Sequence, residues 1–197
     1  MLIMGLVFSA VGCGGSSEGN GEDTNQVKKI VVGSETTFPP FEFEVDGEKL
    51  GFDMDLIRAI GEVQGYEVEI KYQPFDSLIT ALQSGHIDCA VSGMSITPER
   101  LEAVDFSEPY FDAGLIIAVR SDEDSIKTID DLAGKKLAAQ IGTIGAAAAD
   151  GVKEKDASTE VRTFQSIGEA FMELQKGGVD AIVNDHPVTA YYIQTTA

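Results

Sequence analysis

From residue 28 onward, short apolar runs alternate with segments of helical periodicity, and this alternation constrains the fold more than any other feature of the sequence. Residues 53–64 place apolar side chains such as Leu56 and Ile60 on one helical face, and Gly65 follows as the expected helix end. Similar segments separate runs that are typical of strands, at residues 29–32, 68–72, 87–91, 114–119, 136–140, 160–164 and 179–183. Strands that alternate with helices form βαβ units, so the sequence predicts an α/β protein with parallel sheets.

The segments between these strands carry their own signals. Residues 41–45 and 49–52, joined through Asp46-Gly47, predict a small hairpin. Asp76 is expected to cap a helix that runs to Ser84. Later helices are expected near residues 129–132, from about 145, over 166–176 and from 187.

An internal echo predicts two lobes. Residues 82–93 match residues 174–185 in helix end, glycine stop and strand, at a constant offset of 92 residues. Helix–glycine–strand units are common, so chance similarity is the alternative. If the echo is structural, Gly93 and Asp185 end equivalent strands in two lobes that face each other across a cleft.

The segment 92–112 places an arginine at the start of a helix. Thr97 can cap this helix, Pro98 fits its first position, and Arg100 lies in its first turn. Backbone N–H groups and a guanidinium at a helix start together favour a carboxylate ligand. The alternative is a surface helix whose arginine pairs with Glu99, Glu102 or Asp105.

Three motifs occur together and in order: GFDMDL at 51–56, SGMSITPER at 92–100 and VDFSEPYF at 104–111. From about Lys28 to its last residue the chain resembles the extracellular solute-binding proteins of family 3, the amino-acid receptors of ABC importers. The resemblance implies a two-lobed, periplasmic binding protein-like II α/β fold with mixed, mainly parallel sheets and a hinged cleft. It implies lobe 1 at residues 27–112 and lobe 2 at 113–197, with a first hinge crossing at 110–114. Such proteins later return to lobe 1, and we expect that part to be missing after Ala197.

The resemblance also assigns a binding site for a free amino acid. Arg100 corresponds to the arginine that holds the α-carboxylate, together with backbone N–H groups near Thr97 and Thr143. Asp185 corresponds to the carboxylate that accepts the α-ammonium, with the Gly93 carbonyl and the Ser95 hydroxyl beside it. A plain turn at Thr143, and a helix cap at Asp185, are the alternatives.

Selection of the ligand side chain is assigned to four further residues. Phe38 and Phe75 correspond to aromatic positions that sandwich the ligand side chain, with core packing as their alternative. Glu35 stands where a carboxylate contacts the distal polar group, which favours arginine or lysine. Glutamine is the alternative ligand, although the lysine near the site of glutamine receptors is replaced here by Gln140.

The N-terminal residues predict export and anchoring. Residues 1–13 are apolar, too short to span a bilayer, and resemble a lipoprotein signal ending at the lipidation residue Cys13; residues 14–26 form a flexible tether. We therefore expect a lipid-anchored monomer on the periplasmic or extracellular face of the cytoplasmic membrane, delivering its ligand to ABC permease subunits. The net charge of −19 excludes a nucleic-acid partner. Cys89 is expected to be a small buried hydrophobe.

The sequence offers little for catalysis. His86 and His186 have no serine or cysteine nucleophile signature beside them, and the helix dipole explains Asp53 and Asp55 at a helix start. We expect no enzyme activity, no cofactor and no metal. A cyclohexadienyl dehydratase-like enzyme on the same fold, and the sensor module of a receptor, are the alternatives.

Overall fold

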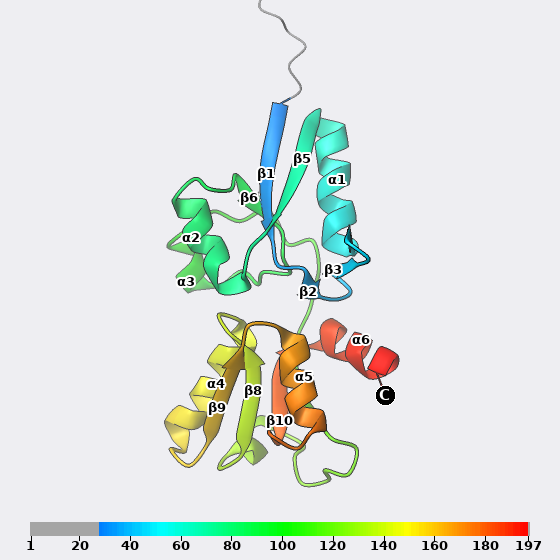
Figure 1. The fold of residues 1–197 in the computed structure, drawn as a ribbon. Helices are drawn as coiled ribbons and strands as arrows, with labels where there is room; N and C mark the ends of the chain where they lie inside the picture. The colour runs from blue at the N-terminus through cyan, green and yellow to red at the C-terminus, as the bar shows by residue number, and fades with distance from the viewer. Residues whose placement is uncertain (1–27, 197) are drawn as a thin grey trace, which may run out of the picture.

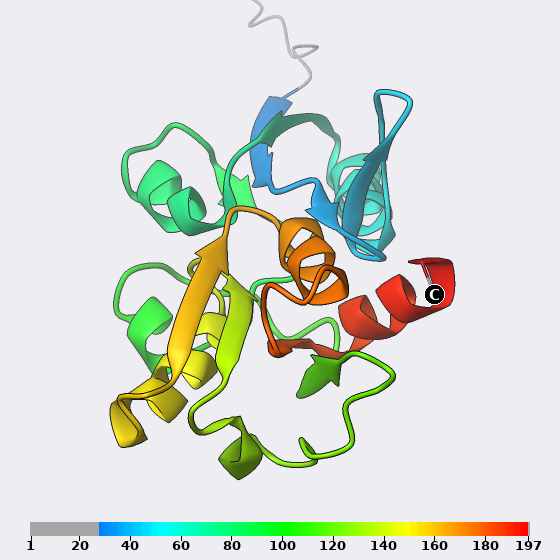
Figure 2. The ribbon, with the colours of Figure 1, turned by 60° about the horizontal axis from the view of Figure 1, so that its bottom comes forward.

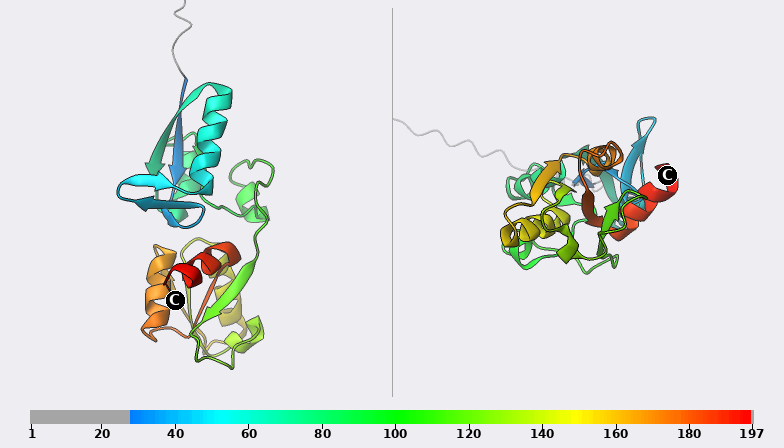
Figure 3. Two further views of the ribbon diagram at one scale, coloured as in Figure 1. Left: turned by 90° about the vertical axis from the view of Figure 1, so that its right-hand side faces the viewer. Right: turned by 90° about the horizontal axis from the view of Figure 1, so that it is seen from below.

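Two parallel-stranded sheets form the centres of two stacked lobes (Figure 1). The structure is a computed structural model that describes residues 28–196. We call the part from residue 28 to the crossing lobe 1 and the part after it lobe 2. Within the described residues the chain passes between the lobes once, between α3 (Pro98–Leu101) and β7 (Leu115–Val119), along one side of the molecule (Figure 3). Cys13 and the tether lie outside the described residues.

Lobe 1 is built around β1 (Lys28–Ser34), which pairs in parallel with β5 (Tyr66–Tyr72) and β6 (Cys89–Ala90). Two helices, α1 (Phe52–Gln64) and α2 (Leu78–Gln83), lie on opposite sides of these strands (Figures 1 and 2). The short antiparallel strands β2 (Thr37–Phe38), β3 (Glu42–Val45) and β4 (Glu48–Leu50) connect β1 to α1. They lie at the end of lobe 1 that faces lobe 2 (Figure 1).

Lobe 2 contains four strands in the order β7 (Leu115–Val119), β10 (Ala181–Asp185), β8 (Lys136–Gln140) and β9 (Glu160–Phe164). The pairing is parallel except between β10 and β7. Successive strand residues point to opposite faces, so Leu137 packs toward α4 (Ile144–Lys155) and Ala138 toward α5 (Ile167–Gln175). The chain then enters α6 (His186–Thr196) directly from β10.

The echo of 92 residues is structural. Gly85 and Gly177 both adopt the left-handed conformation, with φ of 69° and 74°, and end α2 and α5. Gly85 N donates to Leu82 O at 3.0 Å, and Gly177 N donates to Leu174 O at 3.1 Å. These helices therefore end in the same way in both lobes.

Two equivalent aspartates continue the echo into the strands. Asp88 accepts a hydrogen bond from Val31 N at 2.7 Å, and Asp180 accepts one from Lys136 N at 2.8 Å. Each aspartate thus bonds to the strand beside its own, in the middle of β1 in one lobe and at the first residue of β8 in the other. Gly93 and Asp185 follow at equivalent positions and face the space between the lobes.

Several local expectations differ from the structure. Asp76 lies inside the 3₁₀ turn η1 (Phe75–Ser77) and caps no helix, because the turn already begins at Pro74 and Ser77 precedes α2. Only Cys89–Ala90 of the expected strand 87–91 is assigned as strand, although Val91 N still bonds to β1. Cys89 is half-buried rather than buried. Residues 129–132 form a 3₁₀ turn, η2 (Ile129–Leu132).

The β2–β3 segment packs against lobe 2. Phe38 and Phe41 belong to one buried cluster with Ile167 and Phe171 of α5. Aromatic contacts therefore hold the two lobes together on the side opposite α2.

Residues 28–196 contain neither a membrane-spanning helix nor a cluster of metal ligands. No helix there has the length and apolar character that crossing a bilayer requires. No group of three or more His, Cys, Asp or Glu side chains in that range could hold a metal ion.

Candidate functional site

Arg100 reaches from lobe 1 to lobe 2. The short helix α3 (Pro98–Leu101) begins after Thr97, whose hydroxyl accepts a hydrogen bond from Arg100 N at 3.2 Å. The guanidinium donates to Ser95 O at 2.5 Å and, across the cleft, to Gly142 O at 2.9 Å. Its carbon lies 5.5 Å from the centre of the Phe75 ring. Burial lowers the pKa of Arg100.

The alternative interpretation of Arg100 as a surface residue is wrong. No salt bridge joins it to Glu99, Glu102 or Asp105 anywhere in the described chain. The guanidinium of Arg100 donates two of its five N–H groups to backbone carbonyls, so three N–H groups are left for other acceptors.

Asp185 ends β10 on the opposite wall. Its side chain is 8% exposed, and burial raises its pKa to about 6, although the charge of Arg100 works against this shift. A carboxylate is an acceptor without donors, and burial makes it costly to leave without a positive partner. This wall is therefore suited to an ammonium group.

A narrow space lies between these two residues. Its volume is about 10 Å³, which is room for about one water molecule. It is lined by eight of the ten residues expected to bind ligand: Phe38, Phe75, Gly93, Ser95, Arg100, Gln140, Thr143 and Asp185. The other two, Glu35 and Thr97, do not line it.

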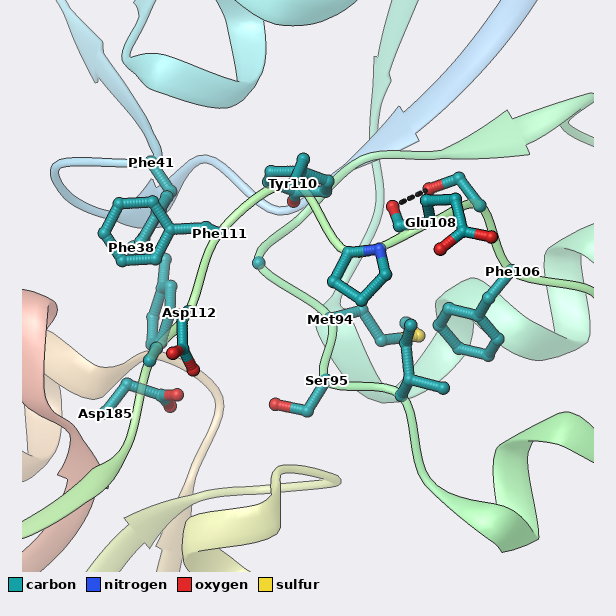
Figure 4. Close-up of a pocket in the computed structure, with 15 residues that line it drawn as sticks. Phe38, Phe41, Met94, Ser95, Phe106, Glu108, Tyr110, Phe111, Asp112 and Asp185 are labelled. Carbon is teal, nitrogen blue, oxygen red and sulfur yellow. Dashed lines mark hydrogen bonds between the residues drawn. The ribbon is translucent and has the colours of Figure 1, made fainter.

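A larger cavity of about 240 Å³ adjoins this space on the side of the crossing. The two share Phe38, Gly93, Ser95 and Asp185 as a common wall. In Figure 4 the carboxylates of Asp185 and Asp112 lie close together, below the ring of Phe111, whereas Glu108 and Phe106 lie on the other side of the cavity. The open volume beside Asp185 thus has both aromatic and acidic side chains around it.

Two buried side chains from opposite lobes, Glu35 and Gln140, each have an acceptor oxygen without a hydrogen-bond partner. Glu35 follows β1 and is 1% exposed; one of its oxygens accepts from the Thr37 hydroxyl, and Oε2 has no hydrogen-bond partner. Gln140 ends β8 and is also 1% exposed; its Nε2 donates to Gln165 O at 3.0 Å, and Oε1 has no partner. Burial raises the pKa of Glu35, and the amide of Gln140 works against the shift. Buried acceptors without donors are unusual and indicate a place for a donor-rich group.

The turn before α4 brings backbone close to lobe 1. Thr143 caps α4 and accepts a hydrogen bond from Ala146 N at 3.2 Å. Gly142 has φ of 77°, and a Cβ added there would lie 3.0 Å from the Cβ of Asp76 in lobe 1. Gly142 therefore permits a close approach of the lobes that a side chain would obstruct.

Sequence reasoning missed a buried network behind the cleft wall. Ser92 donates to Glu42 at 2.8 Å and accepts from Glu35 N at 3.0 Å. Asp53 accepts from Gly93 N at 2.7 Å and from the Tyr110 hydroxyl at 2.9 Å. The only sequence signal was Asp53 in the motif GFDMDL, where the helix dipole offered a sufficient local explanation.

Comparison with known proteins identifies the family. The model of the family described as bacterial extracellular solute-binding proteins, family 3, matches residues 30–161. The chain belongs to this family. Family 3 proteins are extracellular, which agrees with the expected location outside the cytoplasm, and the two-lobed α/β fold agrees with the expected fold class.

The matched relatives of family 3 are named as amino-acid-binding proteins. The arginine-binding extracellular protein ArtP of Bacillus subtilis is 37% identical over 139 residues, which cover 71% of this chain and 53% of ArtP. A probable histidine-binding protein of Campylobacter jejuni is 36% identical over 163 residues, covering 83% of this chain and 62% of that protein. The aligned part therefore spans about half to two thirds of these relatives.

Solved structures agree with the fold. An ancestral arginine-binding protein bound to arginine superposes with a TM-score of 0.82 at 46% identity, covering 84% of this chain and 74% of the other. Holo ArgBP from T. maritima superposes with a TM-score of 0.77 at 42% identity, covering 84% and 73%.

Proposed function

We propose that this protein binds a polar or cationic L-amino acid between its lobes and delivers it to an ABC import permease. Arginine or lysine is the favoured ligand, and glutamine is the alternative. The observation that carries the proposal is the placement of a guanidinium and a buried carboxylate, Arg100 and Asp185, on opposite walls of one space. A zwitterion presents the matching charges at its two α-substituents.

The α-carboxylate is assigned to Arg100 and the α-ammonium to Asp185. A carboxylate that accepts hydrogen bonds from the remaining N–H groups of Arg100 forms a bidentate ion pair with it. An ammonium beside Asp185 relieves the burial of an uncompensated carboxylate, and the Ser95 hydroxyl and the Gly93 carbonyl can accept hydrogen bonds from its remaining N–H groups. Backbone N–H groups near Thr97 and Thr143 assist at the carboxylate end.

The favoured side chain follows from Glu35 and Gln140. Their free oxygens, Oε2 and Oε1, offer acceptors to a group rich in donors, and a guanidinium or ammonium meets that need better than a carboxamide. Phe38 is placed to contact the stem of such a side chain. Phe75 already lies against the guanidinium of Arg100, so its role is to support the arginine as well as to bound the ligand.

Binding requires the lobes to move. The space of about 10 Å³ is too small for an amino acid. We therefore propose that lobe 1 (27–112) and lobe 2 (113–197) open about the crossing at 110–114 and close on the ligand.

Anchoring and assembly complete the proposal. A lipid attached to Cys13 would hold a monomer at the outer face of the cytoplasmic membrane, with residues 14–26 as its tether. Mass spectrometry of the protein from a membrane fraction should show a diacylglycerol addition at Cys13 that Cys13→Ser abolishes. An unmodified cysteine in an otherwise mature protein would refute the anchor.

Calorimetry with the twenty amino acids tests the main proposal. Charge-assisted hydrogen bonds contribute about 1.5–3 kcal/mol each, so Arg100→Ala and Asp185→Ala should each weaken binding by about tenfold or more. Arg58→Ala and Asp150→Ala remove like charges at exposed positions and serve as matched controls. Unchanged affinity in Arg100→Ala or Asp185→Ala, or no binding of any amino acid, would refute the site.

An enzymatic alternative has one observation behind it. An ancestral amino-acid-binding protein described as a precursor of cyclohexadienyl dehydratase superposes with a TM-score of 0.79 at 41% identity. Incubation with a prephenate-like cyclic acid distinguishes the two functions. A binding protein gives saturable affinity for amino acids and no product, whereas aromatic product would support the dehydratase.

A further inference from the structure

One carboxylate oxygen joins the cleft wall to the crossing. Asp53 Oδ2 accepts hydrogen bonds from Gly93 N at 2.7 Å and from the Tyr110 hydroxyl at 2.9 Å. Gly93 belongs to the wall assigned to the ammonium, and Tyr110 is the first residue of the proposed crossing at 110–114. Both contacts converge on a single atom of a side chain with no solvent exposure.

A second carboxylate binds Ser92, the residue before Gly93. Glu42 is fully buried and accepts from the Ser92 hydroxyl at 2.8 Å, and Ser92 in turn accepts from Glu35 N at 3.0 Å. The wall residue Gly93 and the buried Ser92 before it are thus held by two buried carboxyl groups from α1 and β3.

The two carboxyl groups lie close enough for each to shift the pKa of the other. Glu42 Oε2 and Asp53 Oδ1 are buried and have no partner among the hydrogen bonds of the described chain. Burial and then the charge of Asp53 raise the pKa of Glu42 well above its usual value. Burial also raises the pKa of Asp53, while bonds from Gly93 N and Tyr110 oppose this shift. Burial thus disfavours ionisation of both groups, and more strongly for Glu42, where the charge of Asp53 adds to the effect.

The surroundings supply no cation to compensate a second negative charge. The groups that shift the pKa of either carboxyl are Glu35 from the β1–β2 connection, Ser92 and Gly93 from the wall, and Tyr110 from the crossing. No lysine or arginine is among them in residues 28–196. A second ionisation would thus place two uncompensated negative charges side by side.

We propose that Asp53 is a positioning residue for amino-acid binding, which couples Gly93 to the crossing through Tyr110, and that a proton on Glu42 holds Asp53 in place. This inference rests on the proposed function for its role in binding. Motion of the crossing as the lobes close then moves the Gly93 wall with it, because both are tied to one atom. Loss of the Glu42 proton loosens the wall.

A double-mutant cycle on ligand affinity tests the coupling. Tyr110→Phe removes one donor to Asp53 and should weaken binding by about fivefold to tenfold. In an Asp53→Asn background the same change should cost about two- to threefold, because the acceptor no longer carries charge. Asp55→Asn, in the same first turn of α1 but exposed, is the control for the helix dipole and should bind as the wild type does. Equal effects of Tyr110→Phe in both backgrounds would overturn the coupling.

The pH dependence of ligand affinity tests the role of the proton on Glu42. Wild-type affinity should fall as pH rises through the pKa of Glu42, whereas Glu42→Gln, with an N–H donor in place of the proton, should lack this fall. The ligand's own ammonium titrates identically in both proteins, so only the difference between their pH profiles counts. Identical profiles would refute the shared proton.

A ligand-free measurement separates this inference from the proposed function. The Gly93 amide proton, bonded to a buried carboxylate, should resonate downfield and exchange slowly in NMR spectra, and Tyr110→Phe should shift it. If wild type binds no amino acid but Gly93 responds, the proposed function fails and the coupling stands. If binding depends on Arg100 while Gly93 is unaffected, only the coupling fails.

Discussion

Asparagine in place of Asp185 should make the empty protein more stable and its ligand binding weaker. Burial raises the pKa of Asp185 from 3.8 to about 6, so the folded state binds more protons than the unfolded state between these values. Stability of the wild type therefore increases as pH falls through this range, and at neutral pH the ionised carboxylate destabilises the fold. A shift of this size corresponds to at most about 3 kcal/mol.

The expected gain of Asp185→Asn at pH 7 is about 1–3 kcal/mol, because a buried amide still costs part of what the charge cost. Urea unfolding followed by circular dichroism, on protein refolded to remove bound ligand, measures it, and Tm should rise by about 2–4 °C per kcal/mol. Toward pH 4 the wild-type carboxyl becomes protonated and the difference should close. A variant no more stable than wild type at pH 7, or a difference independent of pH, would show that Asp185 is not strained by burial.

Two further substitutions address closure and selectivity. Gly142→Ala puts a side chain on a residue with φ of 77° and places its Cβ 3.0 Å from Asp76, so the lobes should fail to close. In X-ray scattering, saturating amino acid should then leave the radius of gyration of this variant unchanged. Gly151→Ala, where a Cβ meets no atom within 4 Å, is the control and should become more compact with ligand as the wild type does. Glu35→Gln should lower arginine affinity by about tenfold and glutamine affinity by about twofold or less, since only arginine loses a charged partner. Equal losses for the two ligands in calorimetry would contradict the assigned role of Glu35.

The order of helices and strands could be predicted because the sequence patterns that indicate them are local. Strands 136–140 and 160–164 have the expected bounds, and Gly65 ends α1 in the left-handed conformation. The echo placed Gly93 and Asp185 at equivalent positions, since the repeated glycine and aspartate make the same hydrogen bonds in both lobes, although Gly93 lies just beyond β6 and Asp185 is the last residue of β10.

The buried network could not be predicted because its partners are far apart in sequence. Glu42, in the short strand β3, is fully buried because Ser92, 50 residues away in sequence, donates a hydrogen bond to it. The contact of Phe75 with Arg100 could not be predicted for the same reason, because Arg100 comes from a later element of the chain. Such contacts depend on tertiary packing, which overrides local pattern.

The repeated unit differs between the lobes at the position that faces the cleft, where lobe 1 has Gly93 and lobe 2 has Asp185. Two equivalent carboxylates there would leave a zwitterion no preferred direction. In the proposed binding mode, Arg100 takes the carboxylate, Asp185 takes the ammonium, and Glu35 takes the end of the side chain. Three attachments of different chemistry around one tetrahedral carbon distinguish mirror images, so we expect the D-enantiomer to direct its side chain away from Glu35. Asp185, where the repeated unit of lobe 2 departs from that of lobe 1, is one of these three attachments.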